Sequence, residues 1–395
     1  MGRNGSYKGL GIYFFILMIY PQLQADEPVT KTWQSQMRDL SQALSDIVPD
    51  LFSVSSMRNK QEFKNKTQKI YSISLSIDQG AGHGVKTPDG DLTLPYIAQL
   101  FREDIERAYR SVEAGQIEYA KNILRSSVSY CIACHTRSQM GPQFPLLQSF
   151  SEPLKGASWV ERISFQAASR QFDTVYQEVM GQLRDGHTLT ATPMELEKGI
   201  RIALAIGVRV KQSPQQALLL ARSVSESKLT SAAMKKDADL WIADLKAWGS
   251  EKKSVYKSDI DYISTARKLI GNKTGDEDPV WTAGSEIKYL RASLLMHDLL
   301  GAYPKSPFTA EALYLIGLSY DVLHDFGIWS LHEMYYQACV EKKPHSQLAR
   351  RCYARYKDSI ILGYSGSAGT NIPSSMQIHL SRLESLANPP SSSKK

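Results

Sequence analysis

Two cysteines and a histidine close together in the chain are the residues with the clearest chemistry. They form the segment Cys131-Ile132-Ala133-Cys134-His135, in a chain of 395 residues with 4 Cys and 8 His. This Cys-x-x-Cys-His pattern is typical of covalent haem attachment, in which both thiols add to the porphyrin vinyl groups as thioethers. The adjacent histidine then binds the iron as its proximal axial ligand. The spacing therefore predicts one covalent haem c on Cys131 and Cys134, with His135 bound to the iron.

Two other kinds of site use a Cys-x-x-Cys pair. A redox disulfide favours a thioredoxin-like βαβ setting, whereas the residues flanking Cys131 have a helical pattern. A zinc site needs a further pair of ligands at matching spacing, and the chain has no second Cys-x-x-Cys and no His-x₃-His. We therefore favour haem.

The N-terminal segment has the features of a secretory signal peptide. Arg3 and Lys8 precede an apolar run over residues 10–20, and Ala25 ends the segment before Asp26. The apolar run is short for a membrane span. We expect cleavage after Ala25, so that residues 1–25 are removed and no transmembrane segment remains. Export places the chain in the compartment where haem is attached to c-type cytochromes, which predicts a periplasmic protein. The alternative is an uncleaved N-terminal anchor.

The charge of the chain is mildly basic. The formal net charge is +7, and removal of Arg3 and Lys8 with the signal peptide leaves about +5. No block of basic residues indicates nucleic acid as a partner. We interpret this mild charge as a solvated mixed surface, with acidic protein partners as the alternative. The haem motif, and not the charge, leads us to expect a redox protein of the cell envelope as partner.

The remaining cysteines, Cys339 and Cys352, lie in the C-terminal part of the chain. Leftover thiols in an oxidising compartment usually pair. Pro344 breaks a helix between them, so the two thiols can face each other across a helix–turn–helix. We predict a structural disulfide between them, with free buried thiols as the alternative.

Most of the mature chain has apolar residues at helical spacing, which predicts an all-α protein. Between residues 26 and 143 the pattern predicts four helices. They start near Trp33, near Asn59, at Pro95 and at Ile117, and the last of them runs through His135. Pro49 should end or kink the first helix, and the glycine-rich residues 80–90 should form a loop. Four helices of this length with short connections suggest a four-helix bundle. The haem motif then lies at the end of its last helix.

This arrangement resembles the class II c-type cytochromes, the four-helix group around cytochrome c-prime. The run Met37-Arg38-Asp39-Leu40, continuing through Leu44 and Ile47, looks like the first helix of that family. The resemblance implies a haem on the last helix and, as in the low-spin members, a methionine of the first helix as sixth iron ligand. That methionine would be Met37. Up-and-down topology independently places the start of the first helix beside the end of the fourth.

Other iron ligands remain open. The alternative is that Met37 is an ordinary core residue, or that the sixth coordination site of the iron is open. Met57 and Met140 are poorly placed competitors, and His83 in the glycine loop would give a haem with two histidine ligands. The sequence also departs from the class II pattern. The residues directly after His135, 136–139, include no aromatic side chain, which the class II family often has there. Gly141-Pro142 is similar to the loop that follows the motif in class I cytochromes. Under that class I alternative, Met180 would be the ligand.

A second, larger helical region follows a linker at 144–157. The pattern predicts helices over 159–172, 173–183, 194–211, 214–227, 231–248, 258–270, 281–300, 309–324, 328–341, 346–361 and 374–386. Such paired helices suggest an α-solenoid over 158–387, and the tail at 388–395 should be disordered. An irregular helical domain is the alternative.

The residues with the clearest repeat pattern are 303–365. Leu313, Ile316, Gly317 and Tyr320 match the first helix of a tetratricopeptide repeat, and Tyr335, Ala338 and Pro344 match its second helix. This segment resembles the tetratricopeptide arrays of bacterial envelope proteins. The small Gly317 should let the two helices approach closely.

Haem is the only chemistry that the residue pattern predicts. There is no nucleophile triad, no glycine-rich phosphate loop and no cluster of carboxylates at metal spacing, so we expect no catalytic residues, although peroxidase-like activity stays open. We expect transfer of single electrons, with the helical region docking a protein partner. A gas-binding or sensing haem with an open distal site, and a scaffold protein with a structural haem, are the alternatives.

Overall fold

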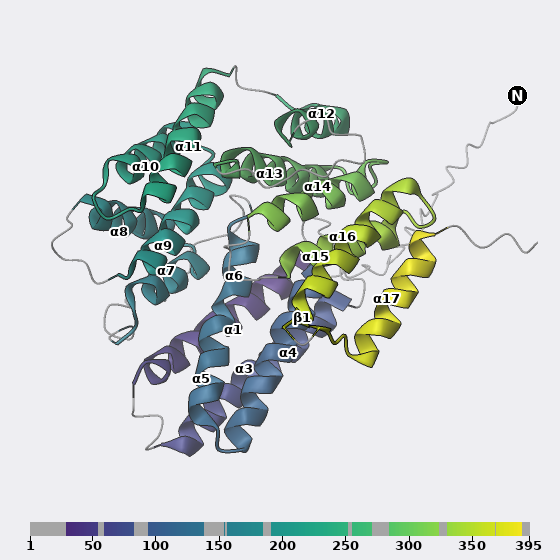
Figure 1. Ribbon diagram of the computed structural model, residues 1–395. Helices are drawn as coiled ribbons and strands as arrows, with labels where there is room; N and C mark the ends of the chain where they lie inside the picture. Colours follow the sequence, from purple (N-terminus) through teal and green to yellow (C-terminus); the bar gives the residue numbers. More distant parts are fainter. Residues whose placement is uncertain are drawn as a thin grey trace, which may run out of the picture.

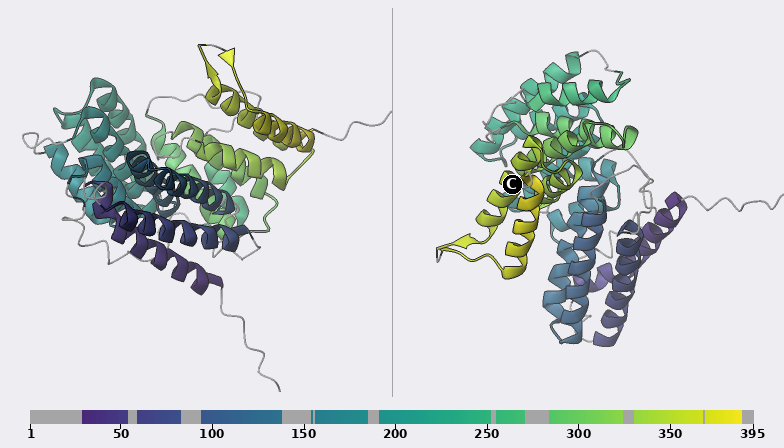
Figure 2. Two further views of the ribbon diagram at one scale, coloured as in Figure 1. Left: turned by 90° about the horizontal axis from the view of Figure 1, so that it is seen from below. Right: turned by 90° about the vertical axis from the view of Figure 1, so that its right-hand side faces the viewer.

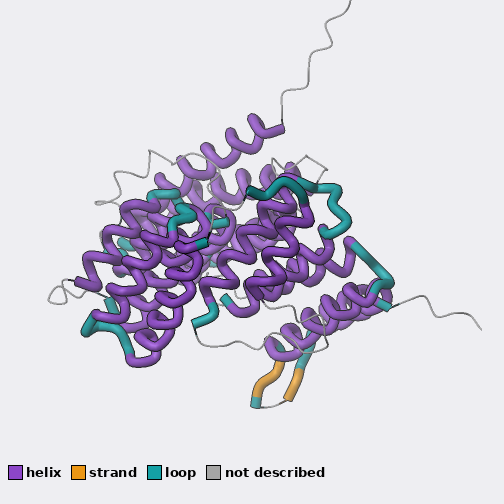
Figure 3. Tube along the Cα trace, turned by 90° about the horizontal axis from the view of Figure 1, so that it is seen from above, coloured by secondary structure: helices purple, strands orange, loops and turns teal. Residues whose placement is uncertain are grey.

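The computed structural model describes residues 29–53, 59–82, 94–137, 154, 156–184, 191–251, 255–270, 284–323, 330–367 and 369–388. In this part of the chain nearly all regular structure is α-helix, with one short pair of strands (Figure 3). The prediction of an all-α protein is confirmed. The signal peptide predicted at 1–25, most of the linker at 144–157 and the tail after residue 388 lie outside the described residues.

The N-terminal helices pack side by side (Figure 1). They are α1 (Val29–Leu51), α3 (Lys60–Gly82), α4 (Leu94–Glu113), α5 (Ile117–Ser126) and α6 (Val128–His135). Helix α3 contacts both α1 and α4, and α5 contacts α4 and α1. Their apolar stripes face inward, since Ile47, Ile70 and Ile105 have no exposed surface. The predicted periodicity of these helices is confirmed.

Two helix boundaries differ from the prediction. Helix α3 continues to Gly82, so residues 80–82 of the predicted glycine loop are helical instead, and residues 83–93 lie outside the described residues. A helix tolerates glycine at a cost of about 1 kcal/mol per residue, which does not by itself end it. In α1, Pro49 lies inside the last turn and the helix ends at Leu51, in line with the predicted stop.

The predicted fourth helix is divided in two at Ser127. The hydroxyl groups of Ser126, Ser127 and Ser129 each donate a hydrogen bond to a carbonyl three residues earlier, at 2.7–2.8 Å. Such side-chain bonds compete with the backbone ladder of a helix. Helix α5 ends at Ser126 within this serine-rich stretch, and the haem motif lies on a separate short helix, α6.

The helices predicted after residue 158 have counterparts in the structure, with boundaries that shift by a few residues. They are α7 (Trp159–Ala168), α8 (Phe172–Arg184), α9 (Pro193–Ala205), α10 (Pro214–Glu226), α11 (Ala232–Ser250), α12 (Asp259–Ile270), α13 (Glu286–Ala302), α14 (Thr309–Val322), α15 (Leu331–Lys342), α16 (Gln347–Gly363) and α17 (Ser374–Ala387). Capping boxes begin two of them, through Ser158 with Glu161 and through Thr192 with Glu195. Each box satisfies backbone N–H groups that a helix start leaves open.

Two small elements were not predicted. Residues Ile206–Val210 form the π-helix η2 at the end of α9, and the strands β1 (Ser365–Gly366) and β2 (Gly369–Thr370) pair between α16 and α17. Figure 2 shows this hairpin at one end of the α16–α17 pair. Neither element has a periodicity that a sequence pattern detects, because each is only a few residues long.

Successive helices of the C-terminal half pack on one another. Helix α10 contacts α11, α12 contacts α13, α14 contacts α15, and α15 contacts α16. Close approach of α14 and α15 depends on Gly317, as predicted, because a Cβ there would lie only 2.5 Å from the ring of Tyr336. The C-terminal helices thus form a series of neighbouring pairs.

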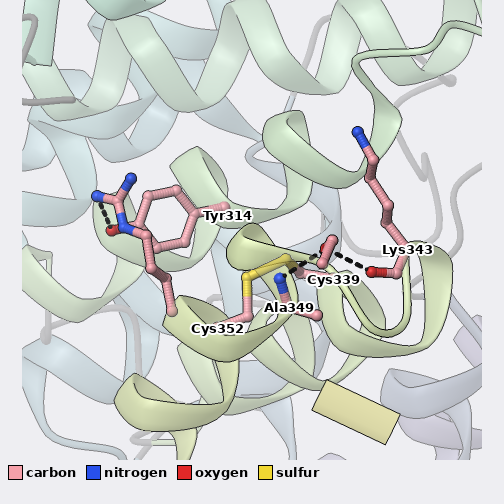
Figure 4. Close-up of a disulfide and its surroundings, with 7 residues drawn as sticks. Tyr314, Cys339, Lys343, Ala349 and Cys352 are labelled. Carbon is pink, nitrogen blue, oxygen red and sulfur yellow. Dashed lines mark hydrogen bonds between the residues drawn. A yellow bond between two sulfur atoms is a disulfide. The ribbon is translucent and has the colours of Figure 1, made fainter. Parts of the chain in front are cut away.

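The disulfide between Cys339 and Cys352 joins α15 to α16, in agreement with the sequence prediction (Figure 4). Both cysteines are fully buried. The turn between them ends at Ser346, whose hydroxyl accepts a hydrogen bond from the backbone N–H of Ala349 and caps α16. The bond therefore fixes a tight helical hairpin.

The hydrophobic core is continuous between the haem-motif helices and the helices that follow. Buried Leu124 and Ile132 belong to the same apolar cluster as Ile163 and Phe165 of α7. A second cluster joins Ile97 of α4 to the apolar side chains of α12–α17. Helix α6 packs directly on α7, so the neighbourhood of the haem motif includes a helix from the second half of the chain.

Candidate functional site

Helix α6 places the three residues of the haem motif on one side. Cys131, Cys134 and His135 follow the i, i+3, i+4 spacing that brings side chains together on one helical face. All three line the same pocket, while Ile132 and Ala133 are buried on the other side of the helix. Neither Cys131 nor Cys134 is part of a disulfide. The spacing of the motif along the chain therefore places its three side chains on the same wall of the pocket.

The pocket lies between α1, α3, α4, α6 and α7. Its atom-free space is about 860 Å³, a volume that includes the open mouth. Its walls are mostly apolar and include Leu40, Leu44, Ile77, Ile97, Phe101 and Phe165. A pocket with this lining suits an apolar ligand.

Met37 of α1 lines this pocket together with the haem motif. Its side chain is partly buried and packs against the N-terminal core. The structure therefore brings together the four residues that the sequence suggested for a haem, which lie on the first and last helices of the N-terminal group. A thioether is a soft ligand that suits haem iron.

The other candidate ligands are not brought to this pocket. Met57, His83 and Met140 lie outside the described residues. Met180 lies on α8, where it packs at the edge of the core, and it is not among the described residues that line the pocket. Within the described part of the chain, no group of three or more His, Cys, Asp or Glu side chains comes together as in a metal-ion site.

The imidazole of His135 is held by a backbone carbonyl of α7. Its Nδ1 lies 2.5 Å from the carbonyl oxygen of Ala168. Because a carbonyl only accepts, Nδ1 carries the proton and donates this hydrogen bond. The other ring nitrogen, Nε2, then has the lone pair that a metal needs.

The environment of His135 favours the neutral imidazole. Burial lowers its pKa to about 4, the positive charge of Arg170 adds to the lowering, and the hydrogen bond to Ala168 opposes it. A histidine must be neutral to bind a metal ion. Burial also raises the pKa of the Cys131 thiol to about 12, and the neighbouring Cys134 adds to the rise.

These residues fit a covalently attached haem. The two thiols and a neutral, oriented imidazole lie at one side of an apolar pocket, and a thioether lines it as well. The pocket walls match an apolar macrocycle, and the donor set matches the soft and nitrogen ligands of haem iron.

Sequence reasoning missed the contribution of α7. Phe165, Ala168 and Ser169 line the pocket, although they lie in the region that the sequence assigned to a separate domain. The capping box of Ser158 and Glu161 indicates where α7 begins. No sequence signal indicated that its C-terminal end would face His135, because the contact is made by a backbone carbonyl.

Comparison with protein-family models, with curated proteins and with solved structures finds no match to this chain. Of the helices described, none combines the length and the apolar character that crossing a bilayer requires.

Proposed function

We propose that this protein is an exported c-type cytochrome with one covalent haem, which transfers single electrons. The observation that carries the proposal is the shared pocket of Cys131, Cys134, His135 and Met37. Residues far apart in the chain meet there in the combination that a low-spin haem c requires.

Each residue has a separate role in the proposed site. Cys131 and Cys134 would hold the haem through thioether bonds, and His135 Nε2 and Met37 Sδ would bind its iron. When bound, haem supplies one-electron chemistry at its iron. The carbonyl of Ala168 keeps His135 in the required tautomer and orientation.

The surrounding side chains favour electron transfer over ligand binding. Leu40, Leu44 and Phe101 line the pocket with apolar surface, together with the motif and Met37. A haem iron held by both His135 and Met37 would need little rearrangement when its charge changes. The apolar wall lowers the local dielectric constant, which makes nearby charges act more strongly on the iron.

We also propose how the rest of the chain serves this function. Helices α1, α3, α4 and the α5–α6 pair would be a class II cytochrome bundle. The helices from α7 to α17 would be a solenoid, with its clearest tetratricopeptide-like part at residues 303–365. The contacts of α3 with α1 and α4, and the serial packing of α10 to α16, support these assignments. The solenoid would dock a redox protein in the periplasm, after removal of residues 1–25.

Optical spectra of the mature protein test the proposal. The protein is produced in a host with the haem-attachment machinery, as wild type, as Met37→Ala and as Met180→Ala. Met180→Ala is a matched control, because it removes a partly buried methionine of α8 that does not line the pocket. We expect a low-spin spectrum with a far-red methionine–iron band that Met37→Ala abolishes and Met180→Ala preserves.

Other spectra would contradict the proposal. A high-spin wild-type spectrum that shifts with carbon monoxide would indicate an open distal site and a gas-binding function. Loss of the far-red band in Met180→Ala, with retention in Met37→Ala, would indicate the class I arrangement. A low-spin spectrum that neither change affects would exclude both methionines and make His83 the next residue to test.

A further inference from the structure

A buried arginine lies at the end of α7, next to the carbonyl that holds His135. Arg170 is only 7% exposed, although an arginine side chain is seldom buried without a specific role. Its guanidinium lies 5.5 Å from the centre of the Phe172 ring, which holds the charge on the first turn of α8. No sequence pattern distinguishes this residue from the other arginines.

The backbone of this turn links Arg170 to His135. The N–H of Gln171 bonds to the carbonyl of Gln166, and the N–H of Arg170 bonds to that of Ala167, which together form a Schellman motif. The motif uses these two carbonyls and leaves the carbonyl of Ala168 to accept the hydrogen bond from His135. Arg170 lies two residues after the atom that orients His135.

The conformation of Arg170 is unusual for its residue type. Its φ of 63° lies in the left-handed region, where this position of a Schellman motif usually carries glycine. A side chain at this position strains the backbone, and the structure keeps it there together with a buried charge.

The α7–α8 turn places Arg170 next to the haem motif. Helix α7 packs directly on α6, and the carbonyl of Ala168 contacts the ring of His135 at 2.5 Å. The buried side chain of Arg170 starts two residues after that carbonyl, so its charge lies on the element that holds His135.

We propose, on the basis of the function proposed above, that Arg170 is a fixed buried cation that raises the reduction potential of the haem iron. Gain of one electron lowers the net charge of the iron site by one unit. A positive charge held nearby in a medium of low dielectric constant stabilises the reduced state more than the oxidised state. The helical region thus tunes the haem as well as docking partners.

Redox titration of the haem-loaded protein tests this role, with the wild type compared with four variants. Arg170→Asn removes the charge and keeps a residue type that tolerates the left-handed region. Arg170→Gly removes the side chain and relieves the backbone strain, so that it folds even if the Asn variant does not. Arg170→Lys keeps the charge. Arg184→Gln is the matched control, because it removes a positive charge from the exposed end of α8.

We expect Arg170→Asn and Arg170→Gly to lower the midpoint potential. At a fixed ambient potential, the ratio of reduced to oxidised haem should fall on the order of tenfold. Arg170→Lys should restore most of the wild-type potential, and Arg184→Gln should leave it nearly unchanged. The absorption spectrum should keep its low-spin form in all variants, because the axial ligands are the same.

Two results would overturn the inference in distinguishable ways. If the variants carry covalent haem but Arg170→Asn and Arg170→Gly match Arg184→Gln in potential, the tuning role is wrong and the proposed cytochrome function stands. If the wild type carries no haem, the proposed function fails and the inference fails with it.

Discussion

Substitution of Gly317 by alanine tests how the repeat-like helices fit together. A Cβ on Gly317 of α14 would lie 2.5 Å from Cε1 and 2.7 Å from Cδ1 of Tyr336 on α15. Ordinary contact begins at 3.4 Å, so the ring would have to retreat by about 0.9 Å. The Tyr336 ring is fully buried and its hydroxyl donates a hydrogen bond to Asp321 at 3.0 Å, which restricts that movement.

The magnitude follows from two opposing effects. Overpacking of a close-packed interior costs about 1–3 kcal/mol, and we expect the upper half of this range because the ring is held in place. Replacing glycine by alanine within a helix stabilises it by about 1 kcal/mol. Gly317→Ala should therefore lower the free energy of unfolding by about 1–2 kcal/mol.

Gly181→Ala is the matched control, and the assay is urea unfolding followed by circular dichroism. Gly181 lies inside α8, where a Cβ would meet nothing within 4 Å. This variant should be more stable than wild type by up to about 1 kcal/mol. The difference between the two variants isolates the steric cost. Equal stability of the two variants would refute the argument that Gly317 sets the distance between α14 and α15.

Three further predictions concern the stability of the C-terminal half. Replacing both Cys339 and Cys352 by alanine should lower the free energy of unfolding by about 3 kcal/mol. This is the chain-entropy value for a cross-link over 13 residues. An unfolding midpoint equal to that of the oxidised wild type would contradict this prediction. Buried Glu286 accepts hydrogen bonds from Arg201 and Trp241, both at 2.7 Å. Because hydrogen bonds to a charged group contribute more than neutral ones, Glu286→Gln should cost roughly 2–3 kcal/mol in urea unfolding. A change below about 0.5 kcal/mol would show that the contact is not needed. Burial raises the pKa of the Asp298 carboxyl group from 3.8 to about 6. The folded state therefore binds the carboxyl proton more tightly than the unfolded state does. Thermal stability should fall as the pH rises from about 4 to about 6. Asp298→Asn should lose this pH dependence, and an unchanged slope would assign it to other groups.

The sequence predicted those features that depend on local pattern. Amphipathic periodicity gave the helices, because burial of one face repeats every three to four residues. The motif Cys131–His135 was visible because its chemistry requires neighbouring residues, and the pairing of Cys339 with Cys352 followed from a short loop with a proline. Met37 was found through resemblance and topology, and it lines the same pocket as the motif.

The sequence could not predict features that depend on packing between distant elements. The carbonyl of Ala168 has no side-chain signature, and Arg170 looks like any surface arginine until its burial is seen. The break at Ser127 lies among hydroxyl groups that bond back to the backbone, and the apolar periodicity runs through it without a change. The continuous core between α6 and α7 joins two regions that composition had separated with a linker.

The measurement that tests the central claim most directly is the intact mass of the purified, denatured mature protein, compared with that of Cys131→Ala/Cys134→Ala. Both are produced with the haem-attachment machinery, and Cys339→Ala/Cys352→Ala serves as a control for loss of two thiols elsewhere. Our account predicts that the wild type and this control carry the added mass of one haem, and that the motif variant carries none. A wild type with no added haem, or haem retained by the motif variant, would contradict it.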